Sequence, residues 1–149
     1  MTGEMREARS SHGCSSYNTG VPGETVVLVA GESGGGGGPE TNSVERMTVT
    51  LAGPGPWEII GRLPGKIGYK SRNGLKHLLF YLLGTRTSFP MISLGGKIYI
   101  LGGYLPFGDD GATSSVLVST DGSDWEETTP LETPRYFHTA VSTETLVCN

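Results

Sequence analysis

The stretch Lys97–Trp125 reads KIYILGGYLPFGDDGATSSVLVSTDGSDW, and it decides the fold. Its run Lys97–Leu101, like Val26–Val29 earlier in the chain, lacks polar alternation, so each of these predicted strands needs burial on both faces. The pair Gly102-Gly103 closes the run Lys97–Leu101, which suits a place where strand backbones crowd together and no side chain fits. The stretch therefore predicts short β-strands joined by turns.

The same order of features recurs along the chain, which indicates an internal repeat. Each unit opens with an arginine that is followed three residues later by His or Phe: Arg9 and His12, Arg86 and Phe89, Arg135 and His138. The first two units then share an apolar run with small residues at its end and a later Trp with a Leu six residues beyond it: Ala30-Gly31, Trp57 and Leu63, then Gly102-Gly103, Trp125 and Leu131.

The spacing of the units is irregular at one place. Arg86 and Arg135 are 49 residues apart, whereas Arg9 and Arg86 are 77 apart. From the Trp to the next Arg the chain takes 10 residues in the second unit and 29 in the first, an excess of 19. The segment Lys66–Gly84 has this length, carries a net charge of +4 in a chain of −4, and has no acidic residue. We therefore interpret it as an insertion between two units.

A period of about 50 residues with roughly four short strands, a glycine pair and a tryptophan resembles the kelch repeat. The matching residues are Gly102-Gly103, Val116–Val118, Asp121, Trp125, Arg135 and His138. The resemblance covers nearly all of the chain outside the insertion. The first unit departs from it where Ala30-Gly31 is followed by Glu32, and neither unit has the tyrosine that usually precedes the Asp-containing turn. It implies an all-β fold, in which each unit is an antiparallel four-stranded blade of a β-propeller.

We expect a first blade over 1–65, the insertion over 66–84 in the inter-blade loop, a second blade over 85–134, and the start of a third, truncated blade over 135–149. A closed propeller has about four to eight blades. The chain is thus expected to be a fragment, with the missing blades supplied by a longer chain or, alternatively, by an oligomer.

The recurrent residues are expected to be structural. They are Arg9, His12, Gly31, Trp57, Arg86, Gly102, Gly103, Asp121, Trp125, Arg135 and His138. The tryptophans are predicted wedges between blades. The arginines are predicted to tie neighbouring blades together through hydrogen bonds to carbonyls or carboxylates.

Binding is expected at one end of the blades, because the loops after the second and fourth strands of a meander emerge there and such loops often carry function. The candidate binding residues are Tyr104, Leu105, Phe107, Asp109 and Asp110; the alternative is that they pack back on their own blade. Kelch propellers generally act as protein-binding platforms. The resemblance therefore implies a non-catalytic protein-binding module or scaffold, such as the substrate-recognition part of an adaptor, with protein partners and neither nucleic acid nor membrane.

Two other classes stay open. Some kelch-like propellers are enzymes, of galactose-oxidase or sialic-acid-epimerase type, yet His12, His77 and His138 lack metal-ligand spacing and Gly34–Gly38 lacks the rest of a P-loop. No catalytic residue, metal or cofactor is predicted, and the chain is not expected to be an enzyme. A membrane-surface or regulatory module could instead use the basic and apolar insertion. Without a signal peptide or a long apolar run, a cytoplasmic location is expected by default.

The insertion is further predicted to be a retained intron. Its 19 codons, or 57 nucleotides, keep the reading frame. Gly65-Lys66 can be encoded with a GTAAG splice donor, and the codons up to Gly84 admit a pyrimidine-rich tract that ends in AG. We expect sequencing to find transcripts that join the codons of Gly65 and Thr85. Transcripts that all keep the 57 nucleotides would contradict this interpretation.

Overall fold

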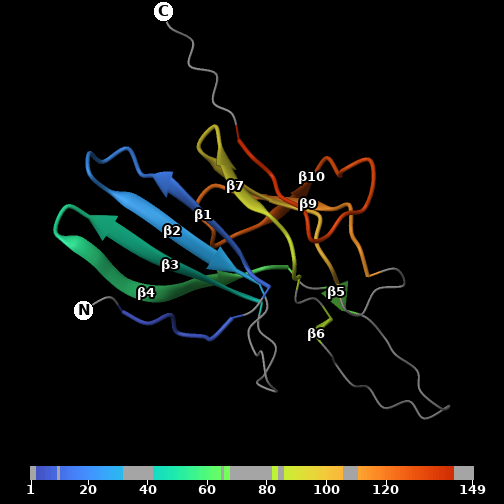
Figure 1. The fold of residues 1–149 in the computed structure, drawn as a ribbon, viewed down its shortest axis with the longest axis horizontal. Helices are drawn as coiled ribbons and strands as arrows, with labels where there is room; N and C mark the ends of the chain where they lie inside the picture. The colour runs from blue at the N-terminus through green and yellow to red at the C-terminus, as the bar shows by residue number, and fades with distance from the viewer. Residues whose placement is uncertain are drawn as a thin grey trace, which may run out of the picture.

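The computed structural model describes residues 3–9, 11–31, 42–64, 66–67, 82–83, 86–105 and 111–142. Over these residues the chain is all-β, with two four-stranded antiparallel sheets, a two-stranded ribbon and no helix (Figure 1). In this part of the chain no helix is long and apolar enough to cross a membrane. The predicted all-β fold class is confirmed. The two four-stranded antiparallel sheets are consistent with the blades of an incomplete kelch-type propeller.

The first sheet is a meander of four sequential strands in the order β1-β2-β3-β4. Its strands are β1 (Gly13–Asn18), β2 (Thr25–Ala30), β3 (Ser43–Thr50) and β4 (Gly53–Arg62). The apolar run of β2 occupies an interior position of the sheet, where both of its faces can be covered. This position accounts for a strand without polar alternation.

The second sheet repeats this topology with β7 next to β8, β8 next to β9 and β9 next to β10. Its strands are β7 (Met91–Leu94), β8 (Lys97–Leu101), β9 (Val116–Ser119) and β10 (Glu126–Thr128). The first strands of the two sheets lie side by side (Figure 1), and the hydroxyls of Ser15 and Ser93 are 2.8 Å apart. Two meanders that meet through their first strands have the arrangement of neighbouring propeller blades.

The two ends of the insertion pair with each other. β5 (Lys66–Ile67) and β6 (Leu82–Leu83) form an antiparallel ribbon in which Lys66 is opposite Leu83 and Ile67 is opposite Leu82. The rest of Lys66–Gly84 lies outside the described residues. The insertion thus leaves and rejoins the path between the two sheets at adjacent points.

The hydrophobic core lies between the two sheets. It is built by buried side chains from both: Val26, Leu28, Ala30, Val44, Leu63, Phe89, Met91, Ile98, Ile100 and Leu117. The turn after β9 closes one side of this core, because Gly122 faces Leu28 and Ile60 of the first sheet. Next to it, a Cβ on Gly61 would overlap the backbone of Ser123. Gly61 therefore sets how closely β4 approaches the second sheet.

A chain of backbone hydrogen bonds runs from one repeat unit to the next. The Ser88 N–H donates to the Ser11 carbonyl at 2.9 Å, and the Phe137 N–H donates to the Ser88 carbonyl at 3.0 Å. All three residues have left-handed backbone conformations, with φ of 52°, 54° and 51° for Ser11, Ser88 and Phe137. Each of them lies two residues after a repeat arginine. The repeat is therefore marked by a backbone conformation that non-glycine residues rarely adopt.

Replacement of Gly61 by Ala is expected to lower the free energy of unfolding by about 1–3 kcal/mol, because the new methyl group displaces the Ser123 backbone and separates the sheets. Gly3→Ala is the matched control, since a Cβ there would be in ordinary contact, 3.7 Å from the nearest atom. Chemical denaturation measures both. Equal midpoints for Gly61→Ala and the unmodified chain would contradict the close approach.

Candidate functional site

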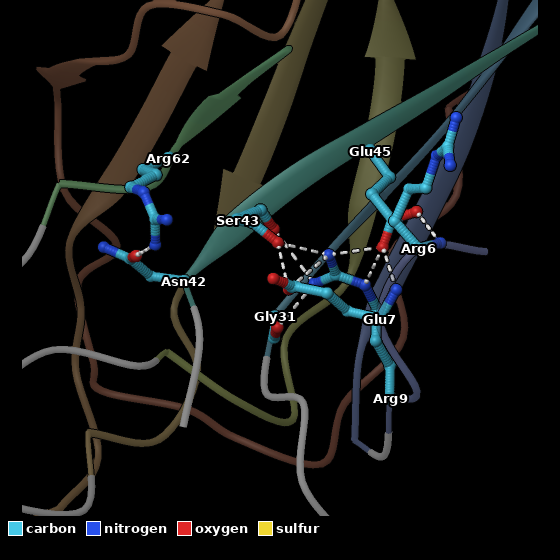
Figure 2. A network of polar contacts seen from close by, with 8 residues as sticks. All are labelled: Arg6, Glu7, Arg9, Gly31, Asn42, Ser43, Glu45 and Arg62. Carbon is cyan, nitrogen blue, oxygen red and sulfur yellow. Dashed lines mark hydrogen bonds and ion pairs between the residues drawn. The ribbon is translucent and has the colours of Figure 1, made fainter. Parts of the chain in front are cut away.

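The loop after the second strand of each sheet is closed at its base by a repeat arginine (Figure 2 shows the first of them). Arg9 Nη1 donates to the carbonyls of Gly31 and Ser43, at 2.8 and 2.9 Å. In the second sheet, Arg86 Nη1 donates to the carbonyls of Gly102 and Ser115, at 2.9 and 3.0 Å. The arginines bind carbonyls as expected, but within their own sheet. The expectation that these bonds tie neighbouring blades was wrong for Arg9 and Arg86.

These bonds also correct the alignment of the units. Gly31 and Gly102 accept equivalent bonds, and Ala30 is opposite Val44 just as Leu101 is opposite Val116. Gly31 therefore corresponds to Gly102, one residue away from the match that the sequence suggested. Gly102 and Gly103 both have positive φ, of 59° and 110°, and a Cβ on either would meet a backbone oxygen. This crowding explains the glycine pair.

The two arginines differ in their electrostatic surroundings. The fully buried carboxylate of Glu45 accepts hydrogen bonds from Arg9 Nη2 at 2.9 Å and from the backbone N–H groups of Arg6 and Glu7, at 2.6 and 3.1 Å (Figure 2). The register places the apolar Leu117 at the equivalent position of the second sheet. Sequence reasoning missed Glu45, although an acid directly after the apolar Val44 was a usable signal.

The hydrogen bonds of the Arg86 side chain among the described residues go to neutral acceptors, which include the Ser115 hydroxyl, to which its Nη2 donates. Burial lowers the pKa of Arg86 to about 10, and the negative charge of Glu127 opposes this change. The guanidinium still carries its charge at neutral pH. Its role is to hold the base of the loop that continues into Tyr104.

Tyr104 begins an exposed aromatic cluster at this end of the second sheet. Its backbone exchanges hydrogen bonds with Thr87, at 2.8 and 2.9 Å, which fixes its position. Its ring lies 5.4 Å from that of Tyr136, and the Tyr136 ring lies 5.3 Å from that of Phe137, with tilts of 54° and 51°. We call Tyr104, Tyr136 and Phe137 the aromatic cluster. They are 36%, 46% and 80% exposed, so they present rings to solvent.

The fold does not require aromatic residues at these positions. Phe137 occupies the left-handed position that Ser11 and Ser88 take in the other units, and Tyr136 occupies the position of Thr87. A bulky residue rarely adopts positive φ, and such conformations concentrate at functional sites. The aromatic cluster is thus an addition to the repeat.

The predicted binding residues lie in different surroundings. Tyr104 belongs to the aromatic cluster, whereas the half-buried Leu105 donates its N–H to the Gly111 carbonyl of its own loop at 2.6 Å. Phe107, Asp109 and Asp110 lie outside the described residues. Sequence reasoning missed Tyr136 and Phe137, because they follow Arg135 and were included in the start of a third unit. Their signal was an aromatic pair where the other units have Ser and Thr.

The remaining repeat residues occupy diverse surroundings. Trp57 is half-buried, and Trp125 packs against the core and donates Nε1–H to the Gly122 carbonyl at 3.0 Å. Asp121 accepts the Ser123 N–H at 2.9 Å, and this bond is the main cause that lowers the pKa of Asp121. His12 and Arg135 are exposed, while His138 is half-buried.

Other chemistry-bearing groups are sparse in the part of the chain that the structure describes. Cys14 is a free, exposed thiol. No cluster of His, Cys, Asp or Glu in the described ranges has the geometry of a metal site. The aromatic cluster and the arginine-closed loops are therefore the features on which a function can be based.

A segment of the chain is similar to part of a known protein. The chain is 34% identical over 58 residues to Kelch-like protein 23 of Mus musculus. The match covers 39% of this chain and 10% of that protein, so the chain spans about a tenth of the relative's length. No protein-family profile matches the chain. The similarity and the two meander sheets together support kelch-type repeats.

Glu45→Ala is expected to lower the free energy of unfolding by about 3–5 kcal/mol, because it removes the fully buried carboxylate partner of Arg9 and leaves only the longer contact with the more exposed Glu7, at 3.4 Å. Glu58→Ala is the matched control. It removes the exposed ion pair with Arg46, whose side chains are 56% and 38% exposed, and is expected to cost less than about 1 kcal/mol. Urea denaturation compares the two. A similar loss of unfolding free energy in both variants would show that the buried Arg9–Glu45 pair does not contribute more to stability than the exposed pair.

Proposed function

We propose that the chain is a non-catalytic protein-binding module built from kelch-type repeats, and that the aromatic cluster is its contact surface. The observation that carries this proposal is an exposed group of three aromatic rings, two of which, Tyr136 and Phe137, occupy positions where the other units have small polar residues. Exposed apolar groups with polar surroundings are typical of protein-interaction sites.

The geometry suits a binding anchor. Aromatic residues are enriched at protein interfaces, and tyrosine is prominent among the residues that dominate binding energy. Backbone hydrogen bonds to Thr87 and Ser88 hold Tyr104 and Phe137 in place before any partner arrives. Such pre-organisation reduces the entropy that is lost when a complex forms. The rings then offer apolar area and the tyrosines also offer hydroxyl groups.

The partial similarity to a kelch-like protein supports the same class of function. Within this proposal, the module recognises a partner protein at the loop end of its blades, as the substrate-recognition part of an adaptor would. The arginine-closed loop bases support that assignment, because they give the loop end a fixed frame on which contact residues are displayed.

The proposal is tested by crosslinking and affinity capture from cell extract with the full chain as bait. A protein recovered at a fixed stoichiometry, whose crosslinks map to Tyr104, Tyr136 or Phe137, is the expected result. Crosslinks that map only to the opposite end of the sheets would contradict the assignment of the site.

The double substitution Tyr136→Thr and Phe137→Ser is expected to weaken capture by about 30-fold, the effect of losing roughly 2 kcal/mol of contact energy. It installs the residue types of Thr87 and Ser88, so the fold should remain stable. Val141→Ala is the control, because Val141 is 82% exposed on the same segment but outside the aromatic cluster. Titration calorimetry with the captured partner measures both; an unchanged affinity of the double variant would refute the site.

A further inference from the structure

His138 lies one residue after the aromatic cluster, and both of its ring nitrogens are buried without a hydrogen-bond partner among the described residues. Its ring packs against Gly102, where an added Cβ would come within 3.2 Å of His138 Cε1. Buried polar atoms without partners are uncommon and cost free energy. The surroundings of this imidazole therefore leave its hydrogen-bonding capacity unsatisfied.

The same place at the preceding boundary between units is taken by a hydrocarbon side chain. Phe89 follows Arg86 by three residues, is 4% exposed, and packs near Gly31, the counterpart of Gly102. His138 follows Arg135 at the same spacing. The site is thus shaped for an aromatic ring without hydrogen-bonding groups, and a neutral imidazole fits it better than a charged one.

The charges around His138 also disfavour its protonation. Arg135, on its own segment, is the positive group that acts on it, while Gly102, the residue after β8, brings no charge. No carboxylate of the described residues forms an ion pair with His138. Burial, and then the charge of Arg135, lower the pKa of His138 below its usual 6.5.

Among the described residues, three backbone hydrogen bonds attach the segment Arg135–His138 to its neighbours. Arg135 donates its N–H to Thr113 at 3.2 Å and accepts from Gly103 at 2.7 Å, and Phe137 donates to Ser88 at 3.0 Å. Its side chains at Arg135, Tyr136 and Phe137 are exposed. A change at His138 is therefore transmitted directly to the neighbouring rings.

We propose that protonation of His138 releases Arg135–His138 from the second sheet and dismantles the aromatic cluster, which makes the cluster acid-sensitive. The consequence for partner binding rests on the proposed function, whereas the release itself does not. Since the docked segment binds protons less readily than the released one, docking is fully stable above the unperturbed value of about 6.5 and weakens as the pH falls below it.

Hydrogen exchange of the full chain, corrected for intrinsic rates, tests the release without a partner. The amides of Arg135 and Phe137, which donate backbone hydrogen bonds, are expected to lose protection several-fold between pH 7.5 and pH 5.5, whereas His138→Phe, which installs the residue type of Phe89, keeps their protection. His12→Phe is the control at an exposed equivalent position and should behave like the unmodified chain. Unchanged protection of the unmodified chain at pH 5.5, or an equal loss in His138→Phe, would overturn the switch.

An NMR titration of the His138 ring in the unmodified chain covers the case in which His138→Phe does not fold. A midpoint below 6.5 that coincides with shifts of the Phe137 ring is expected, and a midpoint at or above 6.5 would overturn the proposal. Capture of the partner at both pH values then separates the two proposals. Release without any effect on capture would contradict the aromatic cluster as contact surface and leave the switch in place.

Discussion

The carbonyl groups at the ends of the second and third strands impose the constraint on which the rest of the structure depends. At these points the chain turns from a strand into a loop. A buried carbonyl needs a hydrogen-bond donor. A single guanidinium satisfies two of them at once, Gly31 and Ser43 in the first sheet and Gly102 and Ser115 in the second. Because its donors form a rigid fork, it also fixes the distance between the two loop ends.

Both sheets place an arginine at the base of the loop, but they differ in whether a carboxylate balances its charge. In the first, Glu45 compensates Arg9 and also gathers backbone donors from the segment before β1. In the second, Leu117 takes the equivalent position and joins the core between the sheets, so Arg86 remains a buried cation beside neutral oxygens. Removing one partner of a buried ion pair leaves an uncompensated charge, so the second sheet depends on the carbonyl oxygens of Gly102 and Ser115 to stabilise the Arg86 guanidinium.

The sequence was sufficient to predict the all-β class, because apolar runs, paired glycines and turn residues recur at one spacing. It could not give the register: β2 has six residues and β8 five, so matching their small residues displaced Gly31 by one position. Nor could it reveal the left-handed conformation shared by Ser11, Ser88 and Phe137, since φ depends on the tertiary hydrogen bonds and no residue type marks it. Tyr104 was predicted from its loop, but its neighbours Tyr136 and Phe137 come together with it only through the path of the backbone.

Comparison of equivalent positions in the repeat units separates residues that the fold needs from residues that it does not need. Where the units share a contact, such as the arginine bonds to the loop base, the residue is explained by the fold. Where one unit departs from the others at an exposed position, packing offers no explanation. Phe137 is the clearest case, because serine adopts the same backbone conformation in two other units and a phenylalanine gains no burial there. A large apolar ring that solvent disfavours and the fold does not need points to a contact outside the chain.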